Sequence, residues 1–137
     1  VASEKYLSEK GLPKTPFDLE QHNLLGGNDL IADSKLVLRS KNEVITVPYF
    51  PRLRLKDHVA ARTAAICGLG ISVHAFQYDT WEYIRRGQLC EVLPEWKPEA
   101  SPVSLLLPQN KTLSSASRTL ADFIEERWKS HPHLTHD

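Results

Sequence analysis

The stretch HVAARTAAICGLGISVHAF, residues 58–76, constrains the fold more than any other part of the sequence. Alanines stand there at positions 60, 61, 64 and 65, which is the spacing of one stripe along an α-helix. Gly68 supplies the left-handed residue that ends many helices, and the apolar residues from Ile71 onward begin a strand. A helix that ends in glycine and leads directly into a short strand is typical of α/β proteins. The small side chains also predict that a sheet or a partner helix approaches this helix closely.

Two further helix starts are visible near the beginning of the chain. Ser3 is expected to cap a short helix over residues 4–10, which Gly11 closes. In KTPFDLEQH, Thr15 stands at the N-cap position, and a proline follows it at the first helical position. We expect this second helix to be short and to end near His22.

Strands and helices alternate along the rest of the chain. KLVLRS and EVITVPYF flank Lys41-Asn42 and predict a β-hairpin. Leu53 and Leu55 alternate with charged residues and predict a half-buried strand, after which Asp57 has the position of a helix N-cap. Further strands are expected at 24–25, 71–73, 89–93 and 103–107, further helices at 79–86 and from 114 or 115 to 128, and a loop at 94–102. This alternation favours an α/β fold.

Charge and hydropathy restrict the classes of function. Lys plus Arg and Asp plus Glu both number 17, so the formal net charge is zero, whereas a free-standing nucleic-acid binder usually carries a basic face. No apolar run approaches the roughly 18 residues of a membrane span. Cys67 and Cys90 follow no metal-binding spacing and are expected to be buried, reduced thiols of a cytoplasmic protein. Because the sequence opens on Val1 rather than methionine, we expect it to be part of a longer chain.

The motifs of common enzyme classes are missing from the sequence. It contains no GxSxG elbow, no Walker A lysine and no GxGxxG after a strand, and neither cysteine has an activating histidine context. The histidines at 131, 133 and 136 belong to a polar tail, for which disorder is expected rather than a metal site. We therefore expect no catalysis, no cofactor and no bound metal ion.

Four segments together resemble LysR-type transcriptional regulators. VASEKYLSEKGLPKTPFDLEQHNLL, residues 1–25, resembles the family pattern VASPxYLxxxGxPxxPxDLxxHxCL. LRLKDHVAARTAAICGLGISVHAF resembles the family's strand, alanine-rich helix, GLGI joint and LLPxF stretch. RRGQLCEVLPEW resembles SGxLVxVLPxW, and PVSLLLPQNKTLSSASRTLADFIEERW resembles the closing strand and C-terminal helix. Each motif is common by itself, but four in the family's order and spacing are specific.

The resemblance implies an effector-binding domain with the type II periplasmic-binding-protein-like fold, in which two α/β lobes enclose a cleft. Residues 1–100 resemble the second lobe, 101–130 resemble the returning crossing strand and C-terminal helix of the first lobe, and 131–137 form a polar tail. The implied partners are a small, anionic effector and further copies of the regulator, as a dimer or tetramer. DNA would be bound only through a winged-helix domain that this chain does not contain. Two alternatives stay open, namely a solute-binding protein of the same fold that serves transport and a small α/β enzyme.

Ligands of open α/β sheets bind beyond the carboxyl ends of strands, where loops and helix N-termini present free N–H groups. Three stretches have such positions, and their candidate ligand-binding residues are Gly26, Gly27, Asn28, Asp57, His58 and His74. Each has a structural alternative: a surface turn for the glycines and Asn28, an N-cap for Asp57, and a hydrogen-bonded structural histidine for His74. His58 and His74 both depart from the family pattern.

The last predicted helix carries an apolar face. Ala116, Leu120, Phe123, Ile124 and Trp128 share it, while Glu125 and Glu126 lie on the solvent side. We expect a neighbouring chain, or residues outside this sequence, to cover that face.

Overall fold

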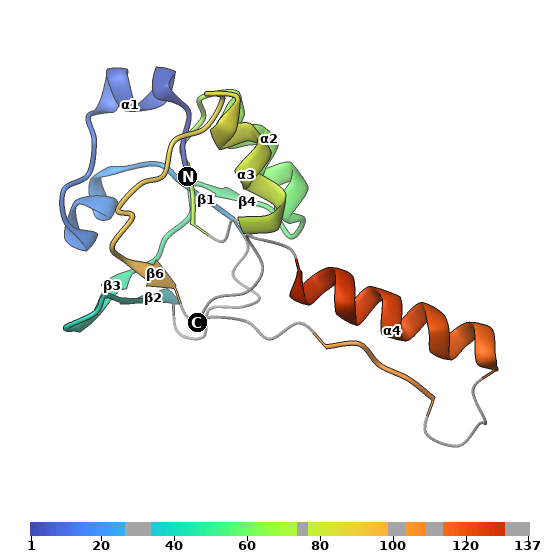
Figure 1. Ribbon diagram of the computed structural model, residues 1–137. Coiled ribbons are helices and arrows are strands. Elements are labelled where there is room, and N and C mark those ends of the chain that lie inside the picture. Colours follow the sequence, from blue (N-terminus) through green and yellow to red (C-terminus); the bar gives the residue numbers. More distant parts are fainter. Residues whose placement is uncertain (27–33, 74–76, 99–103, 109–113, 131–137) are drawn as a thin grey trace. The chain divides into compact units, whose positions relative to one another are not determined.

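The computed structural model describes residues 1–26, 34–73, 77–98, 104–108 and 114–130. The chain divides into two compact units, Val1–Ala100 and Ser101–Asp137. The first unit holds two small sheets with helices around them, and the second holds one long helix (Figure 1).

The first two helices begin where their capping residues predict. α1 spans Glu4–Lys10, and its N-cap Ser3 accepts a hydrogen bond from a backbone N–H of the first turn. η1 spans Pro16–Gln21 and is a 3₁₀ helix. The Asp18 carboxylate accepts hydrogen bonds from the N–H groups of Thr15 and of the preceding residue, at 2.9 and 2.8 Å. These bonds lower the pKa of Asp18 and fix the start of η1.

A three-stranded parallel sheet forms the centre of the first unit. Its strands are β1 (Leu24–Gly26), β4 (Leu53–Arg54) and β5 (Ile71–Ser72), in the order β4-β1-β5. Leu25 pairs with Leu53, and Leu24 pairs with Ile71. Both residues of β4 are exposed. The half-buried strand that we predicted from Leu53 to Leu55 is therefore shorter, and its side chains are more exposed, than expected.

The alanine stripe packs on the parallel sheet of its own unit. α2 spans His58–Ile66, and Ala64 and Ala65 form a buried cluster with Leu25 of β1 and Leu89. Small side chains permit this close approach of helix to sheet. The intramolecular interpretation of the stripe therefore explains its buried side.

The GLG joint after α2 uses its two glycines for different purposes. Gly68 follows the C-cap Cys67 with a φ of +79°, as expected for the residue that ends a helix. Gly70 lies so close to Asn23 that a Cβ at this position would overlap the Asn23 carbonyl oxygen. Only glycine lets β5 begin directly beside β1.

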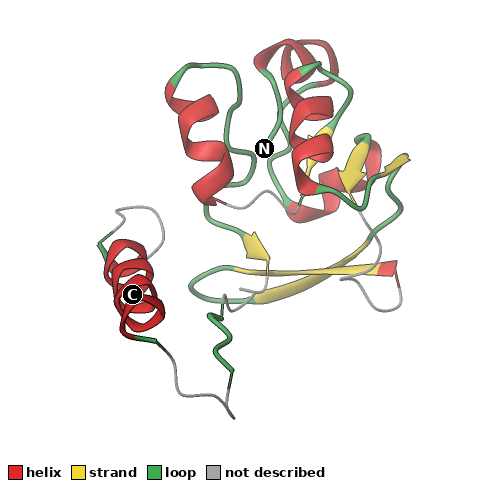
Figure 2. Ribbon diagram, turned by 90° about the vertical axis from the view of Figure 1, so that its right-hand side faces the viewer, coloured by secondary structure: helices red, strands yellow, loops and turns green. Residues whose placement is uncertain are grey.

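The predicted hairpin belongs to a second, antiparallel sheet. β2 (Lys35–Arg39) and β3 (Val44–Pro48) pair along their whole length, and β6 (Lys97–Pro98) adds to the other side of β2. In both views the hairpin lies at the edge of the first unit away from α2 (Figures 1 and 2). The sequence predicted a loop where β6 stands. Proline is compatible with β6 because an edge strand pairs on one side only, so some of its backbone N–H groups are not needed for the sheet.

The main core joins α1, η1 and both sheets. Its buried members are Ala2, Tyr6, Leu19, Leu24, Leu36, Leu38, Val47, Tyr49, Ile71 and Leu93. α3 (Gln77–Arg85) follows β5 and lies close to the predicted helix at 79–86. Gly87, two residues after its end, has a φ of +70°.

Two expectations about residues 89–93 and the thiols were wrong. Cys90 forms a single bridge to Ala2, and Leu93 has a φ of +53°, so this stretch is no continuous strand. Cys67 is exposed and Cys90 half-buried, and both are free thiols. Cys67 is accessible because it caps the helix end rather than facing the sheet.

In the second unit, α4 spans Ser115–Lys129 with Ser114 as its N-cap. Leu120 is 58% exposed and Phe123 59%, and Ala121 is the buried residue of this helix. Residues 104–108 form no strand, and their leucines are exposed, so the predicted strand at 103–107 is not present among the described residues.

Candidate functional site

Three candidate stretches leave the same edge of the parallel sheet. Because β4, β1 and β5 run in the same direction, their carboxyl ends meet at one edge. Gly26 is the last residue of β1, Asp57 and His58 follow β4, and Val73 follows β5. Ligands of parallel α/β sheets bind at such an edge. Gly27, Asn28 and His74 continue two of these stretches and lie outside the described residues.

A backbone hydrogen bond joins the carboxyl ends of β1 and β4. The Leu55 N–H donates to the Gly26 carbonyl at 3.1 Å, which holds the two exits side by side. Gly26 is buried, and a Cβ built on it would lie 2.7 Å from the hydroxyl oxygen of Tyr49. Gly26 therefore gives room to a buried aromatic side chain, a packing role beside its candidate ligand role.

The side chain of Tyr49, in the segment after β3, packs against Gly26 at this edge of the sheet. The sequence did not identify Tyr49 as a residue of the site. Its side chain is fully buried, and desolvation raises its pKa to about 12. The phenol is therefore neutral near pH 7. The signal that was available was the apolar run EVITVPYF, which indicates burial but gives no information about the contact with Gly26.

Asp57 acts as the N-cap of α2. Its Oδ1 accepts a hydrogen bond from the Val59 N–H at 2.9 Å, as the structural alternative for this residue required. His58 is the first residue of α2 and is exposed at the same helix end. An exposed helix start with a filled cap leaves further N–H groups and an imidazole ring near the carboxyl ends of the strands.

An ion pair between α2 and α3 was not predicted from the sequence. Arg62 of α2 donates through Nη1 to the Asp79 carboxylate and, at 3.3 Å, to the Asp79 carbonyl oxygen in the first turn of α3. The guanidinium also lies 4.7 Å above the Tyr83 ring. The Arg62 and Asp79 side chains are only 11% and 19% exposed. This pair fixes the helix after β5 to the helix after β4.

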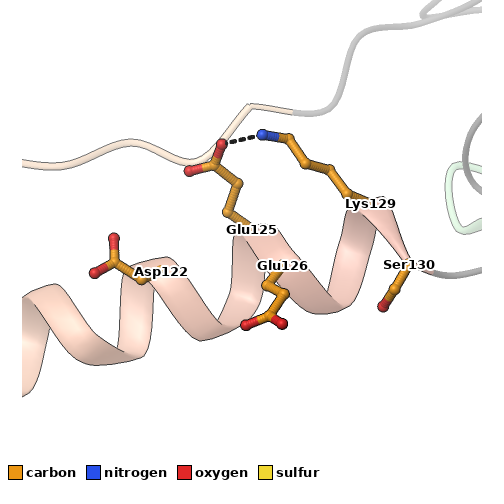
Figure 3. A pocket seen from close by; sticks show the side chains of 5 residues that line it. All are labelled: Asp122, Glu125, Glu126, Lys129 and Ser130. Carbon is orange, nitrogen blue, oxygen red and sulfur yellow. Dashed lines mark hydrogen bonds and ion pairs between the residues drawn. The ribbon is translucent and has the colours of Figure 1, made fainter.

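A shallow hollow lies on α4, in the other unit. Its lining residues are Asp122, Glu125, Glu126, Lys129 and Ser130 (Figure 3). Glu125 and Lys129 form an ion pair of 2.5 Å along the helix, and this bond lowers the pKa of Glu125. All five side chains come from one helix and its cap, and they are exposed. The hollow is the solvated face of a helix rather than an enclosed binding site.

Within the described parts of the chain, no three His, Cys, Asp or Glu side chains gather as a metal ion would require. The helices described there are also too short or too polar to cross a membrane. The histidines at 131, 133 and 136 lie outside the described residues.

Solved structures with the same arrangement are regulatory proteins. The regulatory domain of AphB from Vibrio vulnificus, treated with cumene hydroperoxide, matches with a TM-score of 0.70 and 26% identity, over 91% of this chain and 61% of that one. Full-length AphB of Vibrio cholerae, a virulence activator of the LTTR family, matches with a TM-score of 0.63 and 29% identity, over 72% of this chain and 33% of that one.

Sequence comparison gives the same result. The probable HTH-type transcriptional regulator LtrA of Klebsiella pneumoniae is 30% identical over 131 residues, which cover 91% of this chain and 41% of that protein. The chain spans less than half of the length of the curated relatives that it matches. The family model of the LysR substrate binding domain matches residues 1–129. The chain therefore belongs to the LysR substrate-binding-domain family and has its type II periplasmic-binding-protein-like α/β fold.

Proposed function

We propose that this chain is the effector-sensing part of a LysR-type transcriptional regulator and that it binds a small, anionic metabolite. The observation that carries the proposal is the single sheet edge at which β4, β1 and β5 all end, with the candidate stretches directly beyond it. Backbone N–H groups at such an edge and at the start of α2 suit a carboxylate or phosphate.

The candidate residues have different roles in this proposal. In this proposal Gly26, Gly27 and Asn28 would contribute backbone N–H groups, and His58 and His74 would contribute ring donors to an anion. Asp57 contributes indirectly, because its carboxylate is bonded to the Val59 N–H and thereby orders the helix start.

We assign residues 1–100 to the second lobe, 101–130 to the segment that would form the crossing strand and C-terminal helix of the first lobe in the complete domain, and 131–137 to a polar tail. The exposed leucine and phenylalanine side chains of α4 support this assignment, because an apolar helix face of this size requires cover. In the assembled regulator, residues outside this chain or a neighbouring copy would provide it.

The mechanism follows from the two-lobe fold. The effector binds between the lobes and shifts the population of their relative orientations, and it undergoes no chemical change. The cytoplasmic regulator acts as a dimer or tetramer and contacts DNA through a winged-helix domain outside this chain. The relatives compared above are regulators, so the transport and enzyme alternatives gain no support from them.

Isothermal titration calorimetry of the full-length regulator against a panel of small carboxylates and phosphates tests the proposal. Saturable heat for one compound is expected, and the His58→Ala variant should lower that affinity by about tenfold through loss of one charge-assisted contact. Lys14→Ala, which removes an exposed cation outside the candidate stretches, is the matched control and should bind unchanged. No heat for any compound of the panel, or equal losses in both variants, would contradict the proposal.

A further inference from the structure

A short hydrogen-bonded chain connects α1 to the amino end of β1. The Asn23 N–H donates to the Tyr6 hydroxyl oxygen at 2.8 Å, and this oxygen lies 3.2 Å from Nδ1 of His22. The Tyr6 side chain is 2% exposed, and its ring centroid lies 5.8 Å from that of the imidazole. Because an amide N–H can only donate, the hydroxyl oxygen accepts from Asn23, and its own proton is available for an unprotonated Nδ1 of His22. In the tautomer that leaves Nδ1 unprotonated, His22 is neutral and accepts this proton.

Asn23 in turn joins the amino ends of all three parallel strands. Its carbonyl oxygen accepts from the Ile71 N–H at 2.8 Å, at the start of β5. Its Oδ1 accepts from Nη1 of Arg52 at 3.4 Å, directly before β4, and its Nδ2 donates to the Leu69 carbonyl at 3.4 Å. The strands are so short that, at a rise of about 3.3 Å per residue, their carboxyl ends lie within about 10 Å of Asn23.

We propose that Tyr6, His22 and Asn23 form a proton-operated latch that holds the parallel sheet when His22 is neutral and releases it when His22 gains a proton. A protonated imidazole carries N–H on both nitrogens, so the buried Tyr6 hydroxyl loses the acceptor for its proton. The hydroxyl must then reorient, which weakens its bond to the Asn23 N–H at the start of β1, and the geometry of the strand exits changes with it. The consequence for ligand binding rests on the proposed function, whereas the latch is a property of the chain alone.

The surroundings of His22 favour the neutral ring. Desolvation lowers the pKa of His22, Asp18 of η1 raises it, and Lys10 at the end of α1 lowers it. Arg52, which bonds to the side chain of Asn23, is the further charged group in the cluster. A histidine with a lowered pKa binds fewer protons in the folded than in the unfolded state. The stability that it contributes is therefore complete above its ordinary pKa of 6.5 and is lost as the pH falls through the lower, folded pKa.

A nuclear magnetic resonance titration of the 137-residue chain between pH 8 and pH 5 tests the latch. The amide resonances of Asn23 and Ile71 are expected to shift with the same midpoint as the His22 ring, below the ordinary histidine value. In Tyr6→Phe, which lacks the hydroxyl, the midpoint of His22 should rise by about half a pH unit, and the Asn23 amide should no longer follow it. Asn23 and His22 midpoints that differ, or a His22 midpoint that Tyr6→Phe leaves unchanged, would overturn the proposal.

A second variant decides the question if Tyr6→Phe does not fold. His22→Asn places an oxygen near the position of Nδ1 that accepts from Tyr6 but does not titrate in this range. It should keep the Asn23 resonance at its neutral-pH position down to pH 5, and persistence of the original titration would sink the idea. His58→Asn, which removes an exposed histidine at the start of α2, is the matched control and should leave the coupled midpoints unchanged. Because no ligand is present, the outcome is independent of whether the calorimetry finds an effector.

Discussion

α2 and α4 are both amphipathic helices with a side chain at the N-cap, yet they present different apolar faces. The face of α2 consists of alanines, and Ala61, Ala64 and Ala65 are at most 8% exposed. The face of α4 carries large side chains, of which Leu120 and Phe123 remain more than half exposed. The helix with little apolar surface is covered, and the helix with much apolar surface is not.

The difference indicates where each helix finds its partner. Alanine buries little area, so it stabilises a helix only when a sheet lies close, as β1 does beside Ala64 and Ala65. An exposed leucine or phenylalanine side chain forgoes the roughly 1.5–3 kcal/mol that its burial would contribute, and our proposal assigns the cover of this face to residues outside this chain or to a neighbouring copy. α2 completes the core of its own unit, and α4 offers a surface for packing.

The largest expected effect comes from enlarging the covered face. Ala65→Leu adds three carbons where no space exists and should lower the free energy of unfolding by about 3 kcal/mol. Ala116→Leu makes the same change on exposed α4 and should alter it by less than about 0.5 kcal/mol. Urea denaturation followed by circular dichroism measures both values. Equal losses in the two variants would show that the helices are packed alike.

A smaller effect is expected from the ion pairs of the two regions. Arg62→Ala leaves the largely buried Asp79 carboxylate without its cation and should cost about 2 kcal/mol of stability. Lys129→Ala breaks the exposed pair with Glu125 on α4 and should cost less than about 0.5 kcal/mol. The same denaturation experiment compares them. The double variant Arg62→Met with Asp79→Leu should recover most of the loss, and failure to recover would mean that packing rather than charge is the cause.

The parts of the fold that depend on neighbouring residues were predictable from the sequence. Ser3, Asp57 and Gly68 occupy the caps that we predicted, because capping is decided within a few residues. The hairpin was also predictable, since the alternation of β2 and β3 and the turn between them are local. The position of the candidate stretches beyond the carboxyl ends of strands was predicted from the α/β pattern and from the resemblance of the sequence to LysR-type regulators.

The remaining features depend on contacts between distant residues. Arg62 and Asp79 are 17 positions apart, and nothing in either surrounding sequence indicates the partner. β6 forms by pairing with the edge of β2 that β3 does not occupy, although the residues of β6, Lys97 and Pro98, predict a loop. Conversely, the apolar residues around Leu93 suggested a strand that the positive φ of this residue interrupts. Pairing partners and local backbone reversals, which decided these cases, are not encoded in periodicity.

The smallest expected effect compares the two N-caps. Asp57→Ala removes the acceptor of the Val59 N–H and should lower the free energy of unfolding by about 1 kcal/mol, because α2 is part of the core of its unit. Ser114→Ala removes the acceptor of the Ser117 N–H, but α4 has one buried residue, so we expect the loss to appear as fraying of its first turn. Hydrogen exchange at Val59 and Ser117, measured beside urea denaturation, separates the local from the global effect. Asp57→Ser keeps a capping oxygen and should restore most of the stability. If it did not, the negative charge of Asp57 at the helix N-terminus, and not the capping oxygen alone, would stabilise the start of α2.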